Sequence, residues 1–238
     1  MSGHSKWATT KNKKEAADKK RSSIFTKLAR NISVAARKGG DPDMNFSLRL
    51  AIDRAKDANV PKDNIERAIK KGTGEDGGAV LEEVLYEAYG PHGVPIIIEA
   101  VTDNKNRSTS DIKAILNKYG GTLASQNAVQ WMFEKKGLLR ISLDKVPDID
   151  SFTLELIDLG ADDVREEDAG LTVFVGFTNF EKLKKALEAK NIVTDYAEVE
   201  WVPKEKNNSL DVEAQGKIEN LVEILEDYDD VNNVYTNV

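Results

Sequence analysis

The sequence predicts an α+β protein of several domains. These are an N-terminal three-helix domain and two α+β domains of the ferredoxin-like, split βαβ type, with the third domain inserted into the second. Apolar residues recur at helical spacing up to about residue 71 and at strand spacing beyond about residue 84. A glycine-rich segment, residues 72–78, separates the two regions. The expected domains are residues 1–78, residues 79–136 joined with 204–238, and residues 137–203.

Three helices are expected in the first region. The first runs from about Lys11 to Arg37 and ends at the glycine pair 39–40. The second covers about Met44–Ala58, and the third begins at Pro61, a favoured first helical residue, and ends before Gly72. Each helix has one apolar face, and these faces would form the core of a bundle: Ile24, Phe25, Leu28, Ile32 and Ala35; Leu48, Ile52 and Ala55; Ile65, Ala68 and Ile69.

Strand-like segments dominate the rest of the chain. The second domain is expected to have two strands joined by the hairpin Gly90-Pro91-His92-Gly93, then a helix and a strand, and at its C-terminal end a helix and a last strand. These are Val84–Tyr89, Val94–Val101, Ser108–Lys118, Val129–Glu134, Leu210–Tyr228 and Val231–Thr236. The inserted βαββαβ unit comprises Leu138–Leu143, Ser151–Leu159, Asp163–Glu167, Leu171–Gly176, Phe180–Lys190 and Thr194–Val202.

The separating segment contains a G-x-G-x-x-G pattern at Gly72-Thr73-Gly74-Glu75-Asp76-Gly77. A dinucleotide-binding loop must follow a strand and open a helix, with its backbone N–H groups facing phosphate. This segment follows a predicted helix and carries two acids, so we interpret it as a linker.

Composition excludes several classes of protein. The chain of 238 residues has 40% apolar and 32% charged residues, which is typical of a globular protein. With no cysteine it has no disulfide and no thiolate metal site, and the two histidines, His4 and His92, predict no metal site. Val94–Ile98 is far shorter than the roughly 20 apolar residues of a membrane span. Because Glu15 and Asp18 argue against a transit peptide, we expect a cytoplasmic protein without a membrane partner.

No catalytic pattern is present in the sequence. It lacks a P-loop and an H-E-x-x-H motif, and its acid pairs, Glu82-Glu83, Glu166-Glu167 and Asp229-Asp230, are sequence neighbours of the kind that surfaces solvate. We therefore expect no enzymatic activity, no cofactor and no small-molecule substrate.

Charge is divided unevenly along the chain. The net charge is −7, yet residues 1–75 hold 18 basic and 9 acidic side chains, a net +9, which leaves −16 for residues 76–238. On the first helix, six cations fall within an arc of roughly 100°, opposite the apolar face: Lys19, Lys20, Lys27, Arg30, Arg37 and Lys38. A charged stripe can be an ordinary solvated face, but its single sign favours binding to a polyanion.

Two further features fit a nucleic acid, and each has an alternative. Trp7 lies among lysines and could stack on an unpaired base, or it could pack on the bundle. The predicted turn Asn104–Arg107 precedes a helix, where N–H groups favour an anion, but Asp103 or Ser108 could simply cap that helix.

Several blocks of the sequence together resemble the YebC family over nearly the whole chain. They are Gly3-His4-Ser5-Lys6-Trp7, Phe25-Thr26-Lys27-Leu28, Lys38-Gly39-Gly40-Asp41-Pro42, Asn59 to Ile69, Tyr86 to Pro91, Thr102-Asp103-Asn104 with Asn106-Arg107, and Leu225 to Val231. The sequence departs from the family pattern at Thr9-Thr10-Lys11-Asn12 and at Ser125-Gln126-Asn127, where a glycine-rich turn is common.

The resemblance implies three domains and a nucleic-acid partner. Bacterial members are described as DNA-binding transcriptional regulators, mitochondrial relatives as translational activators, and some members are linked to ribosomes stalled on proline-rich sequences. The residues that the resemblance and the charge pattern nominate as contacts are Lys6, Trp7, Lys11, Lys13, Lys14, Lys19, Lys20, Arg21, Lys27, Arg30, Arg37, Lys38, Asn104, Lys105, Asn106 and Arg107.

The stripe contains Lys and Arg but few Asn or Gln, a composition that suits phosphates more than base edges. We therefore expect a monomeric, non-enzymatic factor that docks through its basic domain on structured RNA, either rRNA or tRNA on the ribosome, and relieves stalling. A transcriptional regulator on duplex DNA is the second hypothesis. A scaffold for acidic proteins is the third.

Overall fold

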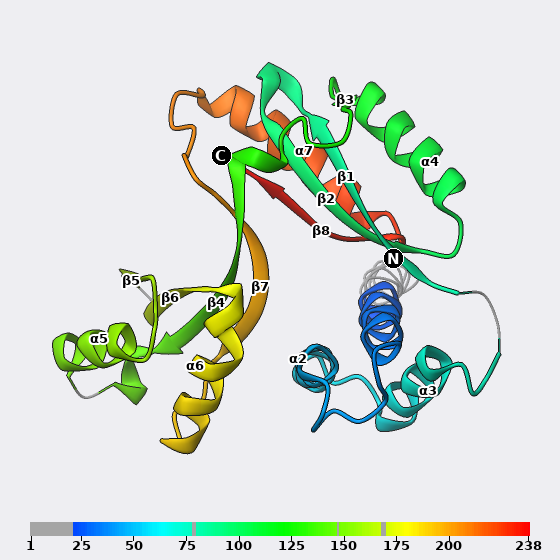
Figure 1. The fold of residues 1–238 in the computed structure, drawn as a ribbon. Helices are drawn as coiled ribbons and strands as arrows, with labels where there is room; N and C mark the ends of the chain where they lie inside the picture. The colour runs from blue at the N-terminus through cyan, green and yellow to red at the C-terminus, as the bar shows by residue number, and fades with distance from the viewer. Residues whose placement is uncertain (1–20, 78–79, 147, 168–169) are drawn as a thin grey trace, which may run out of the picture. The chain divides into compact units, whose positions relative to one another are not determined.

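The computed structural model describes residues 21–77, 80–146, 148–167 and 170–238 (Figure 1). It contains helices and two four-stranded sheets, which confirms the predicted α+β class. The described residues form two compact units, one of residues 21–86, 98–123 and 216–234, the other of residues 87–97, 124–215 and 235–238. The division into three domains stays a prediction. Each described helix is too short or too polar to cross a lipid bilayer.

The N-terminal region forms a helical bundle. A helix described over residues 21–36 packs with α2 (Phe46–Asp57) and α3 (Lys62–Thr73). Most of the predicted apolar faces meet in its core, which contains Leu28, Ile32, Ala36, Leu48, Ile52, Ala55, Val60, Ile65 and Ala68. The prediction was wrong for Ile24, whose side chain is 44% exposed. The core residues recur three or four positions apart because one side of each helix faces the other two.

Side-chain hydrogen bonds of Asn45 and the close packing of Gly72 hold the helices of the bundle together. The amide of Asn45 caps both neighbouring helices: its Oδ1 accepts from the Leu48 N–H at 3.1 Å, and its Nδ2 donates to the carbonyls of Ala35 and Gly39, each at 2.8 Å. Gly72 lies against the first helix, where a Cβ atom would stand 2.2 Å from the Ser33 carbonyl oxygen. The prediction that α3 ends before Gly72 was therefore wrong, because this glycine is a packing position inside the helix.

The end of α3 lies instead at Gly74, which has a left-handed φ of 86°. Pro61 is the residue before the helix and not its first residue. Since Gly72 and Gly74 lie at the end of a helix, the G-x-G-x-x-G pattern does not occupy a strand-to-helix loop, as expected.

The first sheet has the strand order β3-β1-β2-β8. Its strands are β1 (Glu82–Tyr89), β2 (Pro95–Thr102), β3 (Thr122–Leu123) and β8 (Val231–Thr236), and the helices in these parts of the chain are α4 (Lys105–Lys118) and α7 (Val212–Asp227). Short 3-10 turns occur at Pro91–Gly93 and Gln130–Met132.

The prediction of a strand at Val129–Glu134 in this sheet was wrong. The backbone N–H groups of Val129 and Gln130 donate to the buried carboxylate of Glu87, at 2.7 and 2.8 Å, and so do not pair with a strand. Val129 and Phe133 are buried against Ile97, which explains the apolar pattern that suggested a strand. The two-residue strand β3 is instead the fourth strand of the sheet, and it lies at the edge beside β1.

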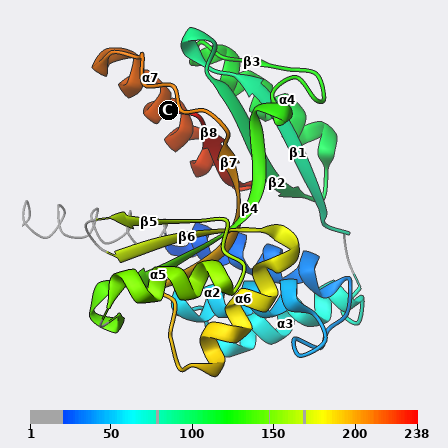
Figure 2. The same cartoon turned by 60° about the vertical axis from the view of Figure 1, so that its left-hand side comes forward.

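The second sheet has the order β5-β6-β4-β7, and its three pairings are antiparallel. It contains β4 (Phe133–Ser142), α5 (Ile149–Asp158), β5 (Asp163–Glu167), β6 (Gly170–Gly176), α6 (Phe177–Ala189) and β7 (Tyr196–Pro203), with a 3-10 turn at Leu143–Lys145. Figure 2 shows α5 and α6 on the same side of these strands. This is the connectivity of a split βαβ unit. The predicted boundary at residues 136/137 falls inside β4.

Candidate nucleic-acid interface

The predicted contact residues fall into three groups. Seven lie outside the described residues: Lys6, Trp7, Lys11, Lys13, Lys14, Lys19 and Lys20. Five lie on or just after the first helix: Arg21, Lys27, Arg30, Arg37 and Lys38. The remaining four, residues 104–107, lie at the start of α4.

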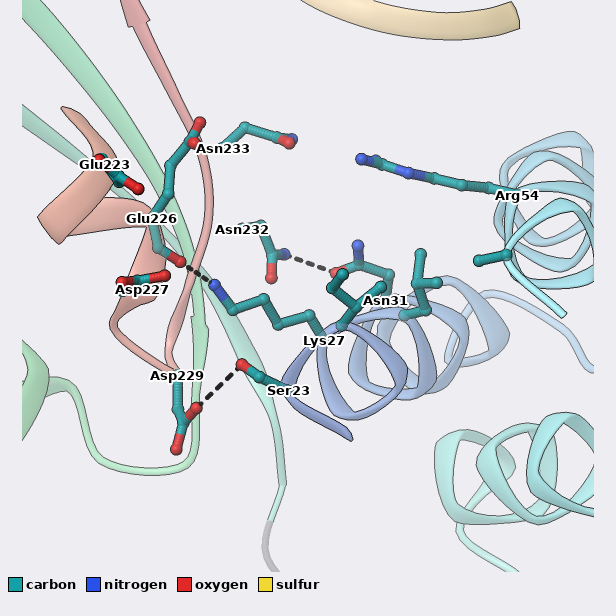
Figure 3. Close-up of a pocket in the computed structure, with 13 residues that line it drawn as sticks. Ser23, Lys27, Asn31, Arg54, Glu223, Glu226, Asp227, Asp229, Asn232 and Asn233 are labelled. Atoms are coloured by element: carbon teal, nitrogen blue, oxygen red, sulfur yellow. Dashed lines mark hydrogen bonds between the residues drawn. The ribbon is translucent and has the colours of Figure 1, made fainter. Parts of the chain in front are cut away.

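Lys27 and Arg30 of the first helix contact the last turn of α7 and the turn that follows it before β8. Lys27 donates from Nζ to the backbone carbonyl of Glu226 (Figure 3). Arg30 donates from Nη1 to the carbonyl of Asp229 at 2.8 Å and forms an ion pair with Asp230 Oδ1 at 2.7 Å. At these two positions of the predicted stripe, oxygens of the same chain accept hydrogen bonds from the cations.

The other described cations of the stripe differ in their surroundings. Arg37 is exposed and donates from Nη1 to the carbonyl of Leu81 at 2.8 Å. Lys38 is exposed. Arg21, a predicted contact that does not belong to the stripe, is exposed as well, and its guanidinium lies 5.3 Å from the centre of the Phe25 ring. Helix geometry correctly placed Arg37 and Lys38 away from the bundle core, since both are exposed.

Asp230 joins the first helix to the first sheet. Its side chain is 4% exposed, and besides Arg30 it accepts from Arg107 Nη2 at 2.8 Å and from Ser108 Oγ at 2.7 Å. The Thr102 hydroxyl lies 3.1 Å away. We expected the neighbouring acids Asp229 and Asp230 to be solvated surface groups. That is wrong for Asp230, whose carboxylate has two guanidinium partners.

This network shifts the pKa of two groups. Burial raises the pKa of Asp230, but the hydrogen bonds from Arg107, Ser108, Arg30 and Thr102 outweigh it and lower the pKa to about 2. Burial, the hydrogen bond to Asp111 and the charge of Asp230 raise the pKa of Tyr228 to about 12. Asp230 is therefore ionised and Tyr228 protonated at neutral pH.

A cavity of about 750 Å³ lies beside these contacts (Figure 3). One wall comes from the first helix and α2 and includes Lys27, Asn31 and Arg54. The facing wall comes from α7 and the start of β8 and carries four carboxylates and two amides: Glu223, Glu226, Asp227, Asp229, Asn232 and Asn233. Ser23 to Asp229 (3.3 Å) and Asn232 to Asn31 (2.5 Å) bridge the two walls. Within the described part of the chain, no three His, Asp or Glu side chains are grouped to hold a metal.

Comparison with known proteins identifies the family. The description "TACO1/YebC protein N-terminal domain" matches residues 5–75, and "TACO1/YebC second and third domain" matches residues 81–238. This chain belongs to the TACO1/YebC family. A relative from Thermoanaerobacter pseudethanolicus, named "Probable transcriptional regulatory protein", is 48% identical over 239 residues, covering 100% of this chain and 97% of the relative.

Other members agree in sequence and in structure. A relative of the same name from Fervidobacterium nodosum is 48% identical and covers 100% of this chain and 93% of its own. The crystal structure of a conserved hypothetical protein from Aquifex aeolicus is 38% identical, with a TM-score of 0.82 over 91% of this chain and 89% of that chain. The resemblance inferred from the sequence blocks is thus confirmed.

Three of those TACO1/YebC blocks are in contact around residues 226–230, one through the bond from Lys27 to the Glu226 carbonyl and two at Asp230 itself. Lys27 belongs to the block Phe25–Leu28, Arg107 and Thr102 belong to the block around Asn104, and Asp230 itself belongs to Leu225–Val231. The hydrogen bonds described above bring Arg30 and Arg107, which lie 200 and 123 positions from Asp230 in the sequence, into one network. The sequence marked each block but not their contact, because nothing local in a block indicates its partner.

The predicted turn of this TACO1/YebC chain is the first turn of a helix. Asn104 is the N-cap of α4, and its side chain accepts from the Arg107 N–H at 3.1 Å. The helix is capped by Asn104 and not by Asp103 or Ser108, as the capping alternative had assigned it, and the contact role of residues 104–107 stays a prediction. Lys105 and Asn106 are exposed, whereas Arg107 is bonded to Asp103 and Asp230.

Asn104→Ala is expected to destabilise the protein by about 1 kcal/mol, the usual cost of losing a side-chain N-cap. Urea unfolding followed by circular dichroism would measure this. Asn104→Asp keeps an acceptor and should restore stability. Equal loss in both variants would contradict the capping role, and an effect on nucleic-acid binding alone would support a contact role.

The sequence analysis of this family member did not identify Trp131 as an exposed aromatic side chain. Trp131 is 64% exposed, and its Nε1 donates to the Ala128 carbonyl at 3.0 Å. Its loop is held by Glu87, which is 4% exposed and accepts from Asn127 N–H at 2.6 Å as well as from Val129 and Gln130. Asn127 has a φ of 65°, a conformation that Asn tolerates better than most residues. Nothing in the local pattern distinguishes this Trp from a core residue.

Proposed function

We propose that this chain is a non-catalytic regulatory factor of gene expression that binds nucleic acid through its basic N-terminal region. The observation that carries the proposal is the charge division, a net +9 over residues 1–75 against −16 over the remainder. Phosphate backbones attract such a surface without any need for sequence readout. The described bundle also presents four exposed cations on α3: Lys62, Arg67, Lys70 and Lys71.

Structured RNA on the ribosome is our preferred partner. The N-terminal region has many Lys and Arg residues, and two of the amides described there have other roles: Asn45 caps two helices, and Asn31 bonds Asn232. This favours recognition of shape and phosphate over base edges. The acidic remainder would be repelled by RNA and would face protein or solvent, so we propose that the basic domain docks and the α+β domains are positioned by it.

Duplex DNA is the second candidate, and the names of the relatives favour it. Proteins 45–48% identical over the whole chain are named as probable transcriptional regulatory proteins. A regulator of that kind would discriminate between DNA sequences by about 1–3 kcal/mol for each mismatched base pair.

A matched pair of variants tests the proposed surface. Lys14, Lys19 and Lys20 would be changed to Glu in one protein, and the exposed Lys182, Lys204 and Lys206 in the control, so both lose the same net charge. We expect at least a tenfold weaker affinity for structured RNA only in the first. Its log–log salt dependence should become shallower by about 0.7–0.9 for each lost contact. Equal affinity in the two variants would overturn the proposal.

The choice between partners needs a competition. Ribosomes, a structured RNA and a promoter-length duplex would compete for the unmodified protein at physiological salt. Preferential capture of ribosomes or RNA supports our ordering, whereas capture of duplex with sequence discrimination supports a transcriptional regulator. Binding to acidic proteins alone would support the scaffold hypothesis and overturn both nucleic-acid proposals.

A further inference from the structure

At Lys27 and Arg30, the cationic side of the first helix contacts an acidic segment of the same chain, residues 226–230. Every residue of this segment except Tyr228 is acidic: Glu226, Asp227, Asp229 and Asp230. The segment presents two backbone carbonyls and one carboxylate to Lys27 and Arg30, and the Asp229 carboxylate accepts from the Ser23 hydroxyl. Four polar contacts therefore join positions about 200 residues apart in the sequence.

The atoms that the segment offers are those that a phosphodiester would offer. Carboxylate and carbonyl oxygens accept charge-assisted hydrogen bonds from Lys and Arg with the same geometry as phosphate oxygens. The N–H groups of Lys27 and Arg30 that donate to the segment are not available to a phosphate while these bonds exist. The surface that the proposed function requires is thus occupied, at these two residues, by an internal competitor.

The segment keeps its own support independently of the helix. Asp230 is also bonded to Arg107, Ser108 and Thr102, all of which come from β2 or α4. The Asp230 carbonyl accepts from the Val101 N–H at 2.8 Å. Loss of the helix contacts would therefore leave the segment attached to its sheet.

The contact with the helix has the features of a separable surface. The cavity of about 750 Å³ lies within it, and its bridging groups are polar. Apolar packing between the helix and the sheet is described for one small cluster, Val34 with Leu81 and Val101. Arg37 adds a bond to the Leu81 carbonyl at the same end. Contacts of this composition resemble transient interfaces more than a domain core.

We propose that the acidic segment 226–230 is an autoinhibitory polyanion mimic that nucleic acid must displace from Lys27 and Arg30 of the first helix. This inference rests on the proposed function, since it assumes that the basic region binds nucleic acid. It adds that the affinity is set by competition within the chain.

A reversible cross-link tests the proposal. Because the chain has no cysteine, Ser23→Cys with Asp229→Cys creates one unique pair, which a short bis-methanethiosulfonate bridges and dithiothreitol releases. The bridged protein should bind a structured RNA about tenfold more weakly than the same protein after release. Asp148→Cys with Ser151→Cys, a local helix-cap pair, is the matched control and should show no difference.

A second pair of variants lowers the negative charge of the segment without a cross-link and leaves the bonds from Lys27 and Arg30 to the backbone carbonyls in place. Asp227→Asn with Asp229→Asn should strengthen RNA binding by about three- to tenfold more than Glu166→Gln with Glu167→Gln, which removes the same charge from an exposed strand. Equal affinity of the bridged and released proteins, or equal gains in the two neutralised variants, would overturn the autoinhibitory contact. Failure of the released and unmodified proteins to bind any nucleic acid would instead overturn the proposed function.

Discussion

Replacing Asp230 with alanine is expected to lower the free energy of unfolding by roughly 3 kcal/mol. The change leaves two guanidinium groups, of Arg30 and Arg107, and three hydroxyls without their shared acceptor. Removing one partner of a buried ion pair costs about 3–5 kcal/mol, and the partial exposure of both arginines places this site at the low end. Urea unfolding followed by circular dichroism measures the loss.

Asp103→Ala is the control for that variant. Asp103 is exposed and contacts the same guanidinium of Arg107 at 3.0 Å, as an i,i+4 pair. Such surface pairs contribute about 0.3–0.5 kcal/mol. Similar losses in the two variants would show that burial of the Asp230 network does not matter for stability.

The lowered pKa of the Asp230 carboxylate predicts that the stability of the protein depends on pH. The pKa of Asp230 is about 2 in the folded protein and 3.8 without such partners, so the folded state favours the ionised form. Its contribution to stability is therefore complete above about pH 4 and is lost as the pH falls from about 4 to about 2. Asp230→Asn should be less stable at neutral pH and lack this part of the acid dependence. An unchanged slope would contradict the assigned pKa.

Replacing Glu87 with glutamine is expected to cost roughly 3 kcal/mol. Both oxygens of Glu87 are used, since they accept from three backbone N–H groups of residues 127, 129 and 130. A glutamine offers one acceptor and turns an NH2 group toward donors, which leaves at least one buried N–H unpaired. Charge-assisted bonds of this kind contribute about 1.5–3 kcal/mol each.

Two measurements identify the cause of that loss. Hydrogen exchange at the amides of Asn127, Val129 and Gln130 should accelerate in Glu87→Gln, and urea unfolding followed by tryptophan fluorescence should shift to lower midpoints. Glu83→Gln, an exposed position on the same strand, should change neither. Unchanged exchange at the three amides would show that the carboxylate does not hold the loop.

Local sequence signals predicted the fold well where the cause is local. The apolar spacing of Leu28 with Ile32 and of Leu48 with Ile52 identified the faces that form the bundle core. The strand Val231–Thr236 was predicted with its observed bounds. The predictions failed where the role of a residue depends on a contact with a residue far away in the sequence. Gly72 was interpreted as a helix end because its close contact with Ser33 lies on another helix.

The candidate site shows the same limit. Helix geometry placed Lys27 and Arg30 on one side of the first helix, but it could not indicate that residues 226–230 lie against that side. Asp229 and Asp230 are adjacent and identical in type, yet only Asp230 is buried. The sequence could not distinguish them, because the difference depends on Arg107 and Ser108, more than 120 positions away.

The place of β8 in the first sheet has a consequence for how the chain folds during synthesis. All strands of the second sheet, residues 133–203, are complete before β8 is made, whereas the first sheet lacks one edge until residues 231–236 emerge. Pairing across such a sequence separation is slow, and synthesis proceeds from the N-terminus. A nascent chain therefore carries the cations of its first helix without their C-terminal oxygen partners for most of its time on the ribosome.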